Sequence, residues 1–437
     1  MDKKFDLGLG HYAVRYLGQC MGFASGRKWL SHKAAFRTSL SSSTADSSLA
    51  NISASLDDWE SNVLLPLAKS GETIRLHDMV GKMPITVMIN ICFGNKFAKN
   101  HTEILDQLRR DADLISETII HNRWAAAALY KYFDTEANRS LHRFKANWKK
   151  LIQSYECSEE RLQGEGGVFD LVLDHVMEGS KKDTISFDEA AATMAEIVVA
   201  NQDVLQPAIT WLFADMLVYP QYLEALSSLK PWEIIDKAAL ETFHSSLLNI
   251  IQESMRVHPP ATISMTEITG KDISIGGYDL PKGTNVSIDL YSMNHNTKCW
   301  SEPEEFKPER FESINDFNSK WGFFKFGFGA RRCPGQYYAN LILVNAMTRL
   351  FSKFDIKCVG LEGINRHDQF PLLGPGALTM LPDCKIKIFE KGIIKIYFFI
   401  STVVFIQITR TRIRCMRIRK RKFGRMKEKM MTRRMRM

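Results

Sequence analysis

Apolar residues recur along much of this chain at the three- and four-residue spacing of helices that bury one face. The longest such pattern follows Ser186-Phe-Asp-Glu189, a capping-box signature, and continues to Val218, just before Pro220. About 30 residues at 1.5 Å each make a helix of roughly 45 Å, long enough to cross a whole domain. Further helices are predicted within residues 83–93, 103–155, 232–258 and 336–354.

Short alternating stretches with glycine and proline predict a smaller amount of β structure. In segment 273–288, Gly276-Gly277 and Pro281-Lys282-Gly283 separate short strands, which predicts a hairpin or meander. A terminal hairpin is predicted over 372–389. The polar run Ser41–Ser48 is predicted to be a loop.

The net charge of +9 is concentrated at the C-terminal end. Residues 410–437 contain 14 Lys and Arg residues and one acid, Glu428, so this stretch carries +13 and the rest of the chain −4. No nucleic-acid partner is expected, because such binding would depend on this stretch alone. The eight cysteines form no Cys-x-x-Cys pair, which argues against a zinc site and fits a reducing compartment.

A glycine-rich loop with one cysteine stands just before the predicted helix at 336–354. It reads Phe326-Gly-Phe-Gly-Ala-Arg-Arg-Cys-Pro-Gly335. The glycines allow positive φ and close backbone approach to a flat ligand, and Arg331 supplies a cation with fork geometry. The positive end of the following helix favours a thiolate at Cys333. A glycine-rich turn with a buried, inert cysteine is the alternative.

The pattern Phe-x-x-Gly-x-Arg-x-Cys-x-Gly resembles the haem-binding loop of the cytochrome P-450 monooxygenases. A chance match in a chain this long is on the order of one in ten thousand. The resemblance rests on Phe326, Gly329, Arg331, Cys333 and Gly335. It implies that Cys333 is the axial ligand of the haem iron, where a thiolate favours O–O cleavage, that Arg331 pairs with a propionate, and that Phe326 and Gly335 belong to the cofactor site. The implied fold is mainly α, a single large helical domain with small β-sheets.

Two further motifs follow the family's order. Glu253-Ser-Met-Arg256 places two opposite charges on one helix face, and Pro308-Glu-Arg310-Phe311 lies in a segment that matches the family's irregular meander. The resemblance implies a buried cluster of Glu253, Arg256 and Arg310 that supports the cysteine loop. These three residues are assigned to the architecture, with no part in the chemistry.

The middle of the long helix reads Ala200-Asn-Gln-Asp-Val204, where the family carries an acid followed by an alcohol. The resemblance implies that Asp203 feeds protons toward bound oxygen through water and that Asn201 faces the same side of the haem. The alcohol is missing, because Val204 and Leu205 occupy its place. Pro207 has no N–H and should kink the helix, and this opened turn is expected to substitute for the distortion that other members obtain with glycine and threonine. The alternative is that Asp203 is an exposed helix aspartate.

Trp29 and Lys33 are four residues apart in a predicted helix. In the family, a tryptophan and a base at this spacing pair with a haem propionate; an ordinary amphipathic helix is the alternative. If the match holds, the chain is truncated at its N-terminal end. It would lack the membrane anchor, the first helices and the small sheet at the substrate entrance.

The domains are expected to be a haem-thiolate domain over 1–390, an apolar segment over 392–408 and a basic tail over 409–437. The apolar segment is at the lower length limit for a membrane span and contains Lys395. A strip lying on an anionic membrane surface agrees better with a domain that meets a cytosolic reductase. The tail is also compatible with a disordered segment or with an artefact of the gene model.

These observations and the resemblance together imply a haem-thiolate monooxygenase. It would insert oxygen from O₂ into a small apolar organic substrate, with electrons from NADPH through a reductase, at the endoplasmic reticulum membrane facing the cytosol. The Asn201-Gln-Asp-Val204 variant is similar to fungal secondary-metabolite members, among them those acting on diketopiperazine-type toxins. The alternatives are a haem-thiolate catalyst of rearrangement, dehydration or oxidative coupling, a truncated and catalytically silent haem protein, and a nucleic-acid- or membrane-binding protein that uses its basic tail.

Overall fold

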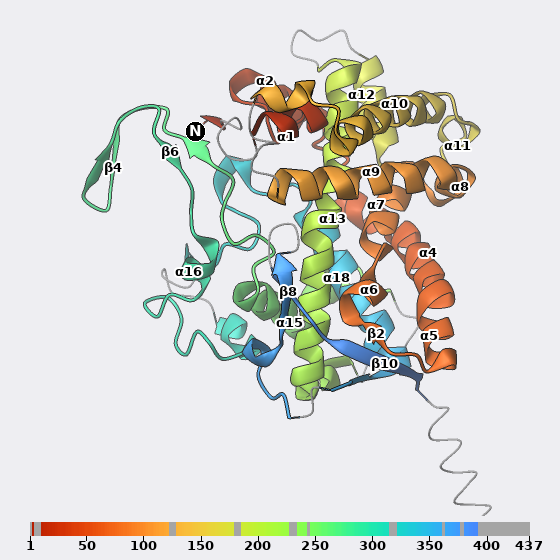
Figure 1. Ribbon diagram of the computed structural model, residues 1–437, viewed down its shortest axis with the longest axis vertical. Helices are drawn as coiled ribbons and strands as arrows, with labels where there is room; N and C mark the ends of the chain where they lie inside the picture. The colour runs from red at the N-terminus through yellow and green to blue at the C-terminus, as the bar shows by residue number, and fades with distance from the viewer. Residues whose placement is uncertain are drawn as a thin grey trace, which may run out of the picture.

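The computed structural model is mainly helical, and the long helix α13 (Phe187–Val218) passes through its centre (Figure 1). The structure describes residues 2–3, 10–121, 128–178, 185–226, 234–242, 245–313, 321–360, 363–375 and 380–391. The predictions for segments 392–408 and 409–437 lie outside the described residues. Within the described ranges, none of the helices combines the length and the apolar character that a membrane span requires.

Helices of very different lengths surround α13. They are α1 (Gly10–Leu17), α2 (Gly26–Ala35), α3 (Ser42–Ser47), α4 (Leu49–Trp59), α5 (Leu65–Ser70), α6 (Leu76–Val80), α7 (Met83–Phe93), α8 (Asn95–Asn100), α9 (Thr102–His121), α10 (Glu136–Glu156), α11 (Glu159–Leu162), α12 (Phe169–Met177), α14 (Lys237–Thr242), α15 (Ser245–Val257), α16 (Leu290–Asn294) and α18 (Gln336–Lys353).

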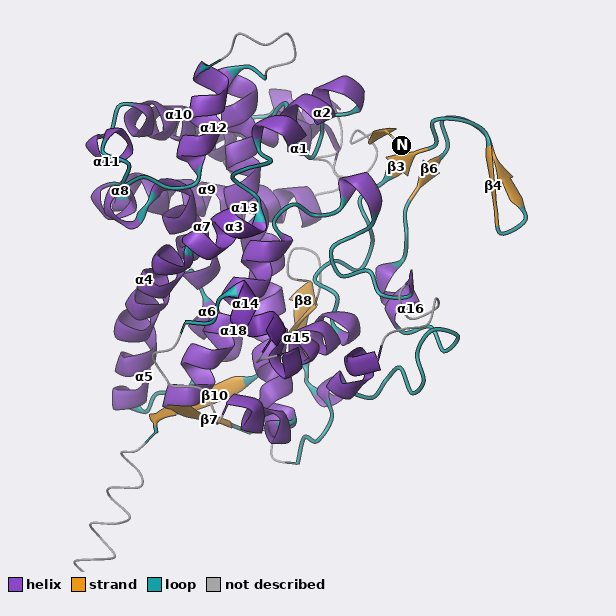
Figure 2. Ribbon diagram, turned by 180° about the vertical axis from the view of Figure 1, so that it is seen from behind, coloured by secondary structure: helices purple, strands orange, loops and turns teal. Residues whose placement is uncertain are grey.

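The strands are short and antiparallel. One sheet has the order β1 (Asp2–Lys3), β3 (Glu267–Ile268), β6 (Asn285–Val286), and a second has the order β2 (Ile74–Arg75), β10 (Lys385–Glu390), β7 (Phe354–Cys358). Two hairpins are formed by β4 (Ile273–Ile275) with β5 (Tyr278–Leu280) and by β8 (Leu372–Pro375) with β9 (Met380–Pro382). The β4–β5 hairpin projects away from the helices, whereas β7 and β10 lie at one end of the helical body (Figure 2).

The predicted capping box at the start of α13 is confirmed. The Ser186 hydroxyl accepts from the Glu189 N–H at 3.2 Å, and the Glu189 carboxylate accepts from the Ser186 N–H at 3.0 Å. These bonds satisfy two of the N–H groups that the first turn leaves open. No break interrupts α13 at Pro207, so the kink expected there stays a prediction.

The core lies where α13 packs on α7, α15 and α18. α7 is buried along nearly its whole length, as its continuous apolar sequence predicts. Residues 103–155 were predicted to be helical, and the structure has two helices there, α9 and α10. They are antiparallel neighbours in contact.

The loop predicted at Ser41–Ser48 is wrong, because residues 42–47 form α3. The Ser41 hydroxyl accepts from the Thr44 N–H at 3.3 Å and caps the first turn. Ala45 is completely buried, and α3 packs on α18. A capped and packed turn thus outweighs the low helix propensity of serine and threonine.

Candidate active site

The cysteine loop is held closed by its own backbone directly before α18. The N–H of Cys333 donates to the Phe326 carbonyl at 2.7 Å. Gly327 and Gly329 adopt φ values of 81° and 67°, a region that favours glycine. The Cys333 side chain is exposed, so its sulfur is accessible to a ligand.

Helix α18 begins at Gln336, three residues after Cys333, and its positive end favours a thiolate there. The helix itself is firmly anchored. Its residues from Leu341 to Phe351 are all buried, and the Tyr338 hydroxyl donates to the Ser39 carbonyl at 2.7 Å. The loop is therefore attached to a rigid element of the core.

The structure brings α2 against this loop, although the two are about 300 residues apart in the chain. Lys33 donates from Nζ to the Ala330 carbonyl at 3.3 Å, and Arg331 donates from Nη2 to the Ala24 carbonyl at 2.6 Å. The indole ring of Trp29 lies 5.0 Å from Lys33 Nζ and 4.4 Å from Arg331 Cζ. Two cations and one indole are thus gathered beside Cys333.

This arrangement fits a haem. An accessible sulfur at a helix N-terminus supplies a soft ligand for iron, and the cations of Lys33 and Arg331 match the anionic propionates of the ring. A Cβ added at Gly335 would meet the Cys333 sulfur at 3.9 Å, an ordinary contact.

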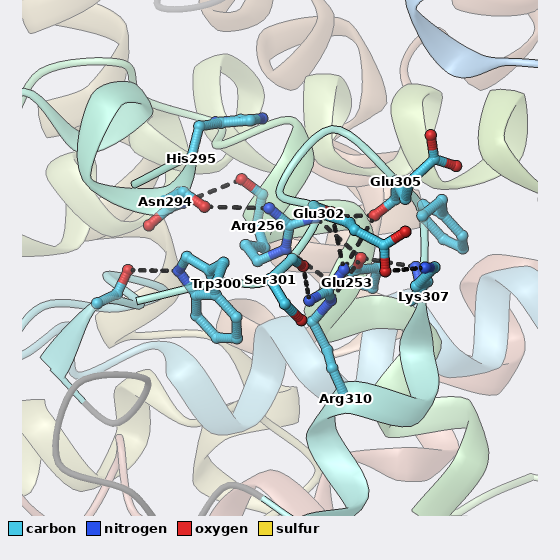
Figure 3. Close-up of polar contacts among 12 residues, drawn as sticks. Glu253, Arg256, Asn294, His295, Trp300, Ser301, Glu302, Glu305, Lys307 and Arg310 are labelled. Carbon is cyan, nitrogen blue, oxygen red and sulfur yellow. Dashed lines mark hydrogen bonds and ion pairs between the residues drawn. The ribbon is translucent and has the colours of Figure 1, made fainter. Parts of the chain in front are cut away.

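A second cluster is built around the buried carboxylate of Glu253 (Figure 3). Arg256, one turn further along α15, donates from Nε and Nη2 to the two oxygens at 2.8 and 2.9 Å. Arg310 donates from Nε to the same carboxylate at 3.1 Å, and the Lys307 N–H also donates to it, at 2.7 Å. The side chains of Glu253 and Arg256 are 0% exposed. Arg256 and Arg310, which the resemblance places in one cluster with Glu253, therefore both bond its carboxylate.

This cluster is joined to the segment that leads into the cysteine loop. Arg256 donates from Nη1 to the Asn294 carbonyl at 3.0 Å, and the buried Asn294 side chain accepts from the Phe324 N–H at 3.2 Å. The Arg256 guanidinium lies 5.5 Å from the Trp300 ring, whose Nε1 donates to the Gly322 carbonyl at 3.2 Å. These bonds fix the backbone just before the loop.

On α13, the Asn201 amide turns back and donates to the Ile197 carbonyl. Asp203 lies within α13, but its side chain is outside the described part of the structure. Val204 is 37% exposed and Leu205 is buried. Both side chains are hydrocarbons, so neither supplies a hydroxyl. Pro207 has no N–H to offer the Asp203 carbonyl.

Comparison with known protein families agrees with this geometry. The family model described as Cytochrome P-450 matches residues 4–383 of the chain. The chain belongs to the cytochrome P-450 family. It is 24% identical over 385 residues to the cytochrome P-450 monooxygenase asaD of Aspergillus flavus, covering 86% of this chain and 70% of that protein. It is 25% identical over 355 residues to the monooxygenase aclC of Aspergillus oryzae, covering 79% and 70%.

The fold agrees as well. A zebra fish cytochrome P-450 solved with abiraterone superposes with a TM-score of 0.71 at 20% identity, covering 87% of both chains. The predicted family and the mainly α fold with small sheets are thus confirmed, and the chain is a P-450 monooxygenase, an oxidoreductase. The family also implies haem held by a thiolate.

Two residues of this P-450 that support the loop were not predicted to do so. Asn294 ends α16, which Asp289 caps by accepting from the Ser292 N–H at 2.9 Å. Trp300 is the second residue, and its ring contacts the Arg256 guanidinium. Their role depends on contacts with α15 and with residues 322–324, and no spacing within the sequence encodes those contacts.

Replacing Trp29 with leucine is expected to weaken haem retention. The change removes the ring beside Lys33 and Arg331, and cation–π contacts contribute about 0.5–2 kcal/mol, which corresponds to a roughly 2- to 30-fold faster haem loss. Transfer of haem to an excess of apomyoglobin measures this rate, and Trp29→Phe, which keeps a ring, should recover part of the difference. Equal rates for Trp29→Leu and wild type would contradict this role.

A second set of buried titratable groups lies between α13 and the residue after α15. Burial raises the pKa of Asp215 to about 7 and lowers the pKa of His258 well below its ordinary value. Nε2 of His258 lies 3.3 Å from Oδ1 of Asp215, and the His258 ring stacks on Trp211 at 3.6 Å. Below about pH 7 this contact joins a protonated carboxyl to a neutral imidazole.

The stability of the P-450 should therefore depend on pH through Asp215. The pKa of Asp215 in the folded protein is above its unfolded value of about 3.9. Its contribution to the free energy of unfolding is therefore fully present below about pH 3.9 and is lost as the pH rises to about 7. When the pH rises from 5 to 7, the free energy of unfolding of Asp215→Asn should fall by about 2 kcal/mol less than that of wild type. Urea unfolding at both pH values measures this, with the exposed Asp279→Asn as the control. Parallel pH profiles for wild type and Asp215→Asn would refute it.

Proposed function

We propose that this P-450 inserts one oxygen atom of O₂ into a small apolar organic substrate, with Cys333 as the axial ligand of its haem. The observation that supports this most strongly is the accessible Cys333 at the start of α18, with Trp29, Lys33 and Arg331 gathered beside it. When bound, the haem supplies the oxygen activation, which a thiolate ligand favours. The resemblance of Asn201-Gln-Asp-Val204 to fungal secondary-metabolite members, together with the similarity to two fungal monooxygenases, supports a role in fungal secondary metabolism, in toxin biosynthesis.

The residues around the cofactor would have distinct roles. Arg331 and Lys33 would hold the haem propionates, and Trp29 would orient these two cations. Phe326 closes the loop, because its carbonyl accepts from the Cys333 N–H. Glu253, Arg256 and Arg310 position the loop from behind. Electrons come from NADPH through a partner reductase, at the cytosolic face of the endoplasmic reticulum, where segment 392–408 rests on the membrane surface.

On the oxygen side, Asp203 would hold and deliver protons through water. Because Val204 and Leu205 carry no hydroxyl, the Asp203 carbonyl, left without a helical partner by Pro207, is the polar group that would hold that water. Asn201 lies on this segment, but its amide donates to the Ile197 carbonyl, so it would contribute its carbonyl oxygen to the distal side.

Replacing Asp203 with asparagine is expected to lower the product formed per NADPH consumed by at least about tenfold, since positioned proton transfer contributes roughly 10²–10⁴-fold. The matched control is Asp188→Asn, which changes an exposed aspartate in the first turn of the same helix. Unchanged coupling in Asp203→Asn would remove Asp203 from the relay.

Oxygen-18 labelling tests the reaction class. The purified full chain, a P-450 reductase and NADPH are incubated under ¹⁸O₂ with a panel of aromatic diketopiperazines. The proposal requires a product that contains one labelled oxygen. A product formed without the label would instead support catalysis of rearrangement, dehydration or coupling, which the missing hydroxyl at Val204 favours. Bound haem with NADPH-reduced iron but no product from any substrate would support a catalytically silent haem protein.

A further inference from the structure

Two cysteines meet in the sheet at the far end of α18 from the cysteine loop. Cys358 ends β7, which continues directly from α18, and Cys384 comes just before β10. Their sulfurs are 3.1 Å apart. A disulfide needs a sulfur separation of about 2.05 Å, so only a small side-chain movement separates the two thiols from a bond.

The backbone around the pair is firmly placed by strand pairing. Cys358 lies opposite Ile386 in the β7–β10 ladder, and the Val359 N–H donates to the Lys385 carbonyl at 2.8 Å. On the other side, the Leu76 N–H donates to the Cys384 carbonyl at 2.8 Å. The closeness of the sulfurs therefore follows from the register of the sheet.

The two thiols differ in a way that suits stepwise oxidation. Cys384 is completely buried, whereas Cys358 is half-buried. A hydrogen bond from Cys384 lowers the pKa of the Cys358 thiol, and the hydrogen bond with Cys358, together with burial, raises the pKa of the Cys384 thiol. The thiolate, which is the reactive form, thus forms at the sulfur that a small oxidant can reach.

We propose that Cys358 and Cys384 are a redox-active dithiol that hydroperoxides convert into an intramolecular disulfide. The Cys358 thiolate attacks one oxygen of H₂O₂, and the O–O bond breaks. The products are a sulfenic acid and hydroxide, which takes a proton to become water. The Cys384 sulfur then attacks the Cys358 sulfur, the S–O bond breaks, and the leaving hydroxyl takes the Cys384 proton as a second water. Two thiols thereby lose two protons and two electrons, and the peroxide is reduced to two waters.

The consequence is a covalent link between β7 and β10, closing a loop whose ends are 26 positions apart. A link of this kind restricts the unfolded chain and stabilises the folded one. In a reducing compartment the resting form is the dithiol, and oxidation is transient and reversible by an external dithiol. β7 and β10 lie at the opposite end of the molecule from α2 (Figures 1 and 2), so the switch is separate from the haem site.

Peptide mapping of the full-length holoprotein tests this directly. The protein is treated with limited H₂O₂, blocked with N-ethylmaleimide and digested with trypsin without reduction. Cleavage after Lys357, Arg366 and Lys385 places the two cysteines in separate peptides, 358–366 and 367–385. The expected result is a linked pair lighter than the sum of the two peptides by two hydrogen atoms, and its disappearance after dithiothreitol. Equal N-ethylmaleimide labelling of both cysteines before and after peroxide would overturn the proposal.

Two controls separate proximity from general reactivity. Cys157 is exposed, so it should stay unlinked under the same treatment; a disulfide to Cys157 that forms before the 358–384 link would also refute the proposal. Cys358→Ser retains a small side chain at a half-buried position, and its melting temperature should not rise on oxidation, whereas that of wild type should rise by a few degrees.

Phenylarsine oxide, which bridges neighbouring thiols, should bind the reduced wild type at 358–384 and fail to bind there in Cys358→Ser. Equal binding by both proteins would count against the pair.

Discussion

Replacing Arg256 with methionine is expected to lower the free energy of unfolding by about 3–5 kcal/mol, a large part of the roughly 5–15 kcal/mol that stabilises a folded protein. The reason is the Glu253 carboxylate. It is fully buried and would lose the partner that donates to both of its oxygens. The Asn294 carbonyl would also lose its donor. Denaturant unfolding followed by circular dichroism measures the change.

Arg366→Met is the matched control. Arg366 also bonds acidic groups, Glu305 and Asp368, but its side chain is 41% exposed, and exposed ion pairs contribute only about 0–1 kcal/mol. The free energy of unfolding of Arg256→Lys should lie between those of Arg256→Met and wild type, because lysine keeps the charge but cannot donate in a bidentate way. A cost for Arg256→Met no larger than that for Arg366→Met would mean that the cluster does not support the fold.

Replacing Cys333 with serine is expected to reduce product formation at least about 100-fold. Changes to groups that merely surround a metal ligand already lower metal affinity or activity about 10- to 100-fold. The fold should survive, because the Cys333 side chain is exposed and fills no space in the core. Turnover with NADPH and reductase measures the loss, and thermal unfolding checks the fold. Cys299→Ser is the control, and equal activity in both variants would remove Cys333 from the site.

The parts of the fold that the sequence predicted well are those with a local signal. The α13 start was predicted by Ser186 and Glu189, each of whose side chains accepts from the backbone N–H of the other residue. The ion pair of Glu253 and Arg256 likewise joins residues three apart on one helix. Arg310 was added to that pair by the family's motif, since its position 54 residues further along has no physical meaning in the sequence alone.

The parts that the sequence could not supply depend on long-range packing. The spacing of Trp29 and Lys33 was compatible with an ordinary amphipathic helix, and only the folded chain brings them to Arg331. Cys358 and Cys384 looked like two unrelated cysteines, because their contact depends on the register of β7 and β10. Ser41–Ser48 shows the reverse case, in which burial of Ala45 makes a helix from residues that favour a loop.

The carbon monoxide difference spectrum of the reduced full-length protein tests the central claim most directly. If Cys333 holds the haem iron from the loop before α18, the spectrum shows the band of a thiolate-ligated haem, and Cys333→Ser lacks it. Haem that is bound and reduced but gives no thiolate band in the wild type would contradict the proposed site.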